Sequence, residues 1–82
     1  MPIKRGTVVL CLKGKDKGCL AAVLTDSDTA VLIADGKRRP LEHPKHKNRK
    51  HISVSAHVLS DFEMATNKSL RRALNALATA NQ

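Results

Sequence analysis

Three short apolar runs alternate with polar loops in the first 34 residues. The runs are TVVLCL at 7–12, LAAVL at 20–24 and AVLIA at 30–34. The loops between them, KGKDKG at 13–18 and TDSDT at 25–29, are built from residues that turns favour. Short apolar runs bounded by turn residues predict β-strands.

Two further strands are expected beyond this point. Asp35-Gly36 follows the third run and favours a two-residue hairpin, because glycine tolerates a positive φ. Residues 37–42 then predict a fourth strand, which must lie at a sheet edge because Pro40 cannot donate a ladder hydrogen bond. Residues 52–54 (ISV) predict a fifth. Strands spaced in this way are typical of a small barrel or sandwich.

The hydrophobic period changes near Ser55. Apolar side chains recur at helical spacing over 58–65, and Ser55 is a suitable N-cap. A second apolar stripe runs over 70–77, with Thr66 or Asn67 as its N-cap. We therefore expect a barrel at 1–54 and two short helices at 55–82, packed together as one domain.

Length and composition agree with one small domain. Its 82 residues provide a core of valine, leucine, isoleucine and alanine, with Phe62 as the sole aromatic residue. No segment approaches the roughly 18 apolar residues of a membrane span, and residues 1–6 do not read as a signal peptide. Two cysteines do not make a disulfide framework, and Cys11 is expected in the core. We expect a cytoplasmic protein without a membrane partner.

The formal net charge is +8, and much of it lies between residues 37 and 50. This segment, KRRPLEHPKHKNRK, contains seven lysines and arginines and a single glutamate. Such a density of like charge repels itself unless a polyanion neutralises it, and nucleic acid is the commonest partner of a small basic domain. The loop at 13–18 adds three lysines, with Asp16 expected to order the turn through its own backbone.

The chain resembles the KOW family in two stretches. RGTVVLCLKGKDKGCLAAVL at 5–24 is similar to a KOW motif, in which a Gly-Lys-Asp-Lys-Gly loop joins two strands. ADGKRRPLEHPKHKNRKHI at 34–52 and TNKSLRRAL at 66–74 extend the likeness. Together they resemble the KOW-domain large-subunit ribosomal proteins of archaea and eukaryotes, and still more their small stand-alone bacterial relatives. Cys19 and Ala21 depart from the pattern, because a basic residue and a glycine are common at these positions.

The resemblance implies an SH3-like β-barrel that binds RNA, usually ribosomal RNA. We therefore expect a ribosomal protein or an accessory factor of translation or ribosome assembly. Both basic segments are expected to converge on one side of the barrel. The expected turn residues are Gly14, Gly18, Asp35 and Gly36. The expected RNA contacts are Lys13, Lys15, Lys17, Lys37, Arg38, Arg39, Lys45, His46, Lys47, Arg49 and Lys50.

Two other binding functions stay open. SH3-like barrels in the transcription and translation machinery also bind proteins, although a protein-binding groove calls for more exposed apolar or aromatic surface. Non-specific DNA binding shares the same charge. With a single aromatic residue, we expect recognition of RNA shape and backbone rather than stacking of splayed bases.

Catalysis and metal binding are not expected. The chain lacks a phosphate-binding glycine loop, a plausible carboxylate pair and a Ser-His-Asp arrangement. His43, His46 and His51 lack the paired cysteines of a zinc site, and lysine and arginine surround them. The sequence therefore predicts no enzyme activity, no cofactor and no small-molecule substrate.

Overall fold

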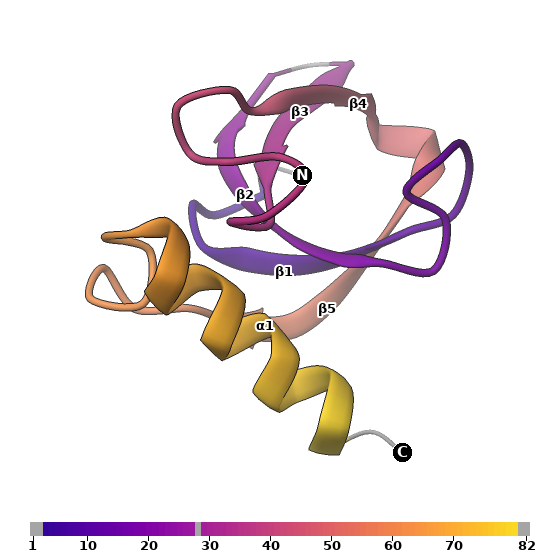
Figure 1. The fold of residues 1–82 in the computed structure, drawn as a ribbon. Coiled ribbons are helices and arrows are strands. Elements are labelled where there is room, and N and C mark those ends of the chain that lie inside the picture. The colour runs from indigo at the N-terminus through magenta and orange to yellow at the C-terminus, as the bar shows by residue number, and fades with distance from the viewer. Residues whose placement is uncertain (1–2, 28, 81–82) are drawn as a thin grey trace.

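The structure, a computed structural model, describes residues 3–27 and 29–80. It contains a five-stranded antiparallel sheet followed by one helix (Figure 1). The spatial order of the strands is β4-β3-β2-β1-β5. The elements are β1 (Thr7–Cys11), β2 (Leu20–Asp26), β3 (Ala30–Ala34), β4 (Lys45–Asn48), the 3₁₀ turn η1 (Arg49–His51), β5 (Ile52–Val58) and α1 (Asn67–Ala80).

The first three strands are confirmed, and their alternation divides the apolar residues between two faces. The register pairs Val8 with Ala22 and Val9 with Ala21, so neighbouring positions point to opposite sides of the sheet. The concave inner face buries Val9, Cys11, Ala21, Val23, Val31, Ile33 and Ile52. The outer face buries Val8, Ala22 and Ala34 together with Leu59, Met64, Leu70 and Leu74.

The prediction of a fourth strand at residues 37–42 is wrong. The Asp35 carboxylate accepts hydrogen bonds from the backbone N–H of Lys37 at 2.8 Å and of Arg39 at 2.9 Å. The N–H groups of Asp35 and Gly36 also both donate to the Arg39 carbonyl. These bonds form a compact turn that replaces the two-residue hairpin. Pairing with β3 therefore begins only at Lys45, which lies opposite Ile33.

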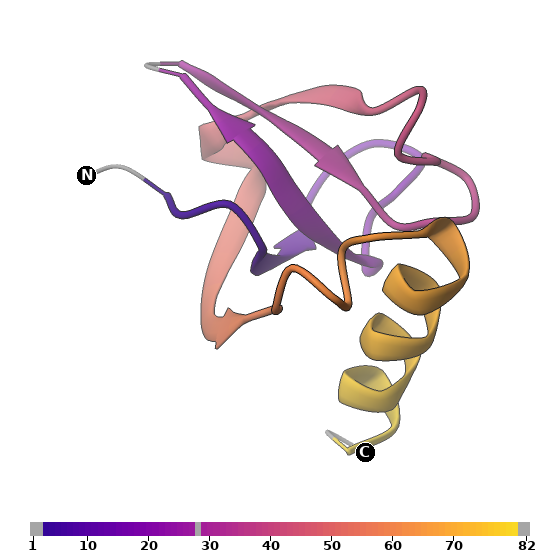
Figure 2. The same ribbon diagram turned by 90° about the vertical axis from the view of Figure 1, so that its left-hand side faces the viewer.

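The sheet curls strongly but does not close into a barrel. Within the described residues, β4 and β5 are the two edges and do not pair with each other. The turn η1 carries the chain from one edge to the other, and the Asn48 side chain caps it by accepting from the Lys50 N–H at 2.9 Å. Figures 1 and 2 show how strongly the sheet curls.

The predicted fifth strand at 52–54 is confirmed, but it continues to Val58, so the prediction of two helices is wrong. Ser55 does not cap a helix: its hydroxyl donates to the carbonyl of Val8 on β1 at 2.7 Å. The chain then makes a single turn, in which Ser60 and Glu63 exchange hydrogen bonds between side chain and backbone. The apolar stripe of 58–65 is consequently split, with Leu59 buried and Phe62 exposed.

The second apolar stripe does form a helix, α1. Thr66 and Ser69 cap its N-terminus reciprocally, each side chain accepting from the other's backbone N–H at 3.2 Å or less. Leu70 and Leu74 are buried in one cluster with Val8, Ala22 and Ala34 of the sheet. Among the described residues, no helix combines the length and apolar character needed to cross a membrane.

Candidate nucleic-acid interface

The KGKDKG loop is a tight double turn between β1 and β2. Gly14 and Gly18 both have positive φ angles, of 85° and 84°. The Lys17 N–H donates to the Gly14 carbonyl and the Cys19 N–H donates to the Asp16 carbonyl. The side chains of the three lysines, Lys13, Lys15 and Lys17, are left exposed around the turn.

Asp16 ties this loop to the later basic segment. Its side chain is turned inward and the residue is only 4% exposed. One carboxylate oxygen, Oδ2, lies 3.5 Å from Arg39 Nη2 and 4.0 Å from Lys45 Nζ. We expected Asp16 to act through its own backbone, and its carbonyl does so. Its carboxylate, in addition, joins segments that are 23 residues apart in the sequence.

Two further contacts bring the segments together. Arg38 Nη1 donates to the carbonyl of Lys15 at 3.4 Å. Lys47 Nζ donates to the carbonyl of Lys13 at 2.7 Å. The loop at 13–18 and residues 37–45 therefore lie on the same side of the molecule, away from the N-terminal segment (Figure 2).

Lys47 is a structural residue rather than a surface cation. It is 7% exposed, and on β4 it lies opposite Val31 of the inner cluster. A side chain at position 14 would crowd it, since a Cβ there would lie 3.2 Å from Lys47 Nζ. Lys47 thus lies on the inner face of the sheet, with its amino group bonded to the Lys13 carbonyl of the loop.

Other predicted contact residues lie elsewhere. Arg49 Nη1 lies 3.2 Å from Asp26 Oδ1 and 3.3 Å from the Ser27 carbonyl, so it holds the turn between β2 and β3. His46 points to the opposite face of β4 from Lys45 and Lys47, because neighbouring strand residues alternate. Lys50 is exposed on η1.

Helix α1 contributes a cation that the sequence did not connect to this surface. Arg71 shares a hollow of about 290 Å³ with Gly18, Asp35 and Lys37. The helical pattern at 66–77 places Arg71 on the polar side of α1. Nothing in that pattern shows that the helix lies beside the loop.

Over residues 3–27 and 29–80, no group of three histidine, cysteine, aspartate or glutamate side chains is arranged to hold an ion. Cys11 is buried in the core, as predicted. Burial raises the pKa of its thiol above the ordinary value of 9.0, and nearby Lys47 partly offsets this shift.

The resemblance to the KOW family depends on the sequence stretches at 5–24, 34–52 and 66–74. No protein-family model matches this chain, and it has no significant match among curated proteins.

Proposed function

We propose that this protein binds structured RNA, and ribosomal RNA in particular, through the surface formed by residues 13–18 and 37–45. The proposal rests on one observation, the set of contacts between the two segments. Arg38 donates to the Lys15 carbonyl, and the Asp16 carboxylate pairs with Arg39 and Lys45. These contacts join two basic segments into one cationic surface. A polyanion that spans the surface can contact both segments at once.

The exposed cations on this surface are well suited to phosphates. Lys15, Lys17, Lys37 and Arg38 are all exposed, while the carboxylate of Asp16 is buried and already paired. Arginine can hold a phosphate with two parallel hydrogen bonds, and lysine supplies a mobile point charge. The glycines of the loop also permit a close approach of the backbone to a phosphodiester.

The arrangement of the site is held by the fold rather than formed on binding. Arg39 and Lys45 are partly committed to Asp16, and Lys47 is committed to Lys13. These three residues position the loop, so we assign the phosphate contacts to the exposed cations around it. A preorganised surface loses less conformational entropy on binding.

The wider role follows from the resemblance to KOW proteins. We interpret the curled five-stranded sheet as an SH3-like arrangement with one open side. In this proposal the protein acts in the cytoplasm as a ribosomal protein or as a factor of translation or ribosome assembly. It needs no cofactor and performs no catalysis there.

A protein-interaction module is the second candidate, and one observation favours it. Strand β5 is a sheet edge, and it carries Val54 at 52% and Val58 at 50% exposure. A partner could add a strand to such an edge and cover these side chains. This surface is separate from the Asp16 site.

Salt-titrated binding to ribosomal RNA fragments tests the proposed function. If about five phosphates are neutralised, log K should fall by roughly 3.5 to 4.5 for each tenfold rise in salt concentration. A generic lysine-rich peptide provides the reference affinity, and duplex DNA of equal length tests for non-specific binding. Binding no tighter than the peptide, without a salt slope, would refute the proposal.

Charge-reversal variants locate the surface. Lys37→Glu with Arg38→Glu should weaken RNA binding by at least about 100-fold, because two contacts become repulsions. The matched control is Lys4→Glu with Lys50→Glu, which makes the same change in net charge at other exposed positions. Equal losses in the two double variants would show that only net charge matters.

A further inference from the structure

Phe62 is exposed although it is the sole aromatic residue of the chain. Its spacing from Val58 and Leu59 predicted a core position, yet the structure leaves it 83% exposed. A lone exposed phenylalanine contributes almost nothing to folding, since its apolar surface stays in water. The exposed position of Phe62 therefore points to a role in binding rather than in folding.

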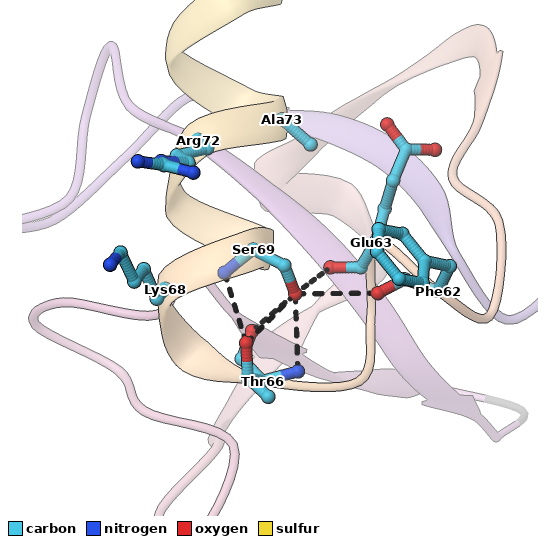
Figure 3. A pocket seen from close by; sticks show the side chains of 7 residues that line it. All are labelled: Phe62, Glu63, Thr66, Lys68, Ser69, Arg72 and Ala73. Atoms are coloured by element: carbon cyan, nitrogen blue, oxygen red, sulfur yellow. Dashed lines mark hydrogen bonds between the residues drawn. The ribbon is translucent and has the colours of Figure 1, made fainter.

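The backbone beneath Phe62 is held firmly. Its carbonyl accepts from the Ala65 N–H at 3.3 Å and from the Ser69 hydroxyl at 3.3 Å. The single proton of this hydroxyl is shared among three acceptors, since the carbonyls of Glu63 and Thr66 also lie within hydrogen-bond distance of Ser69 Oγ, both at 3.0 Å. The ring is consequently carried by a turn that is fastened to the first turn of α1 (Figure 3).

Two cations lie across a hollow from the ring. The hollow has a volume of about 460 Å³, and Lys68 and Arg72 of α1 also line it, on the far side of Ser69 and Thr66 from the ring (Figure 3). Glu63 lies beside the ring, but its carboxylate accepts hydrogen bonds from the N–H and hydroxyl of Ser60 at 3.0 and 3.1 Å. The hollow thus offers an apolar ring face on one side and positive charge on the other.

The helix that lines this hollow also borders the proposed RNA surface, although the two hollows share no residue. Arg71, next to Arg72 on α1, shares a hollow with Lys37 and Gly18 of the basic segments. The whole molecule measures only 28 × 26 × 23 Å. A polynucleotide on the loop surface can therefore continue past Arg71 to Phe62.

We propose that an unpaired nucleobase of the bound RNA stacks on Phe62, while Lys68 and Arg72 hold the adjoining phosphates. This inference rests on the proposed RNA-binding function and departs from the expectation of shape and backbone recognition alone. It adds a class of target, RNA with an unpaired base beside a folded region. Stacking on an aromatic ring accepts any base, because every base has a π-face. The cations favour a nucleotide over an apolar protein segment, which would leave their charges without partners.

Binding of two matched RNA hairpins to Phe62→Ala tests this proposal. One hairpin is fully paired next to its loop and the other carries a single bulged nucleotide. Loss of one stacked base should reduce affinity for the bulged hairpin by about 5- to 150-fold and leave the fully paired hairpin unaffected. Val58→Ala, which truncates another exposed apolar side chain, is the control and should change neither affinity.

A second variant reports on stacking directly. The chain contains no tryptophan or tyrosine, so Phe62→Trp introduces a single fluorescent probe at the proposed platform. Its emission should be quenched by the bulged hairpin and unchanged by the paired one. This measurement does not require any loss of affinity.

The outcomes separate the two proposals. If the wild-type protein binds neither hairpin above the peptide reference, RNA binding itself fails. If it binds both, but Phe62→Ala affects them equally and Phe62→Trp shows no selective quenching, the stacking platform alone is refuted. Lys68→Gln with Arg72→Gln should reproduce part of the loss on the bulged hairpin, and no effect there would exclude the phosphate contacts.

Discussion

At the residue level, Lys37 and Lys47 differ sharply although both belong to one basic segment. Lys37 is exposed, whereas Lys47 is 7% exposed and bonds to the Lys13 carbonyl. Amino-acid composition does not distinguish these two lysines. Only the alternation along β4 and the position of the loop make one structural and leave the other available to a ligand.

Lys47→Ala should lower the free energy of unfolding by about 1 to 3 kcal/mol. The change deprives the Lys13 carbonyl of its partner and removes a buried side chain. Lys37→Ala is the matched control and should stay within about 0.5 kcal/mol of wild type, as exposed substitutions do. Urea unfolding of both variants measures the difference, and equal stabilities would contradict the assigned role of Lys47.

Cys11 should make stability depend on alkaline pH. Burial raises the pKa of its thiol above 9.0, so the folded state holds the proton more tightly than the unfolded state. The resulting contribution to stability is complete below pH 9 and is lost as the pH rises from 9 through the raised pKa. Stability of the wild type should therefore fall over this range by more than that of Cys11→Ala.

Urea unfolding across this pH range checks the prediction. Cys19→Ala is the control, because it keeps the buried thiol and should keep the full decline. The same decline in Cys11→Ala would assign it to other groups, such as the lysines.

At the level of elements, the apolar patterns of the sequence predicted three strands and one helix correctly and a second helix wrongly. The three apolar runs form β1, β2 and β3, and the stripe at 70–77 lies on α1. The pattern at 58–65 failed because β1 offered Ser55 and its neighbours a pairing partner. Tertiary pairing outweighed a helical period that covered only about two turns.

Gly36→Ala should destabilise the fold much more than Gly18→Ala. Both glycines have positive φ, which costs an alanine about 1 to 2 kcal/mol. A Cβ at position 36 would also overlap the Asn67 carbonyl, whereas nothing lies within 4 Å of one at position 18. The turn at 35–39 would have to separate from α1 to accept the methyl group.

Thermal unfolding of the two variants provides the comparison. Gly36→Ala should also disturb the neighbouring links from Asn67 to Leu41 and Glu42. Similar losses in both variants would mean that the contact between turn and helix is unimportant.

At the level of the whole molecule, the site depends on which segments the sheet brings together. The order β4-β3-β2-β1-β5 places β4 at one edge, and the curl carries Lys45 and Lys47 to the loop between β1 and β2. The sheet stays open and the loop at 13–18 is bonded to Lys45 and Lys47, which leaves Lys37 and Arg38 exposed to solvent. The same curl, with η1 bridging its edges, leaves β5 unpaired on its outer side within the described residues.

The sequence predicted most of the cations that make up the candidate site. It did not predict which of them are bound within the fold and which are left exposed. The sequence indicated the loop lysines and the segment at 37–50, since charge density is a local property. It did not indicate that Arg49 serves the turn between β2 and β3 or that Arg71 borders the site. Those assignments depend on contacts between residues more than 20 positions apart.

Local patterns alone were enough to define most strands, the last helix, the glycine turns and the strong positive charge, because each follows from neighbouring residues. Folding in three dimensions decided that the sheet stays open, that the predicted strand at 52–54 continues to Val58 in place of a helix and that Phe62 faces solvent. These outcomes follow from competition between local preference and distant pairing or burial, and the energies of distant contacts are not visible along the chain.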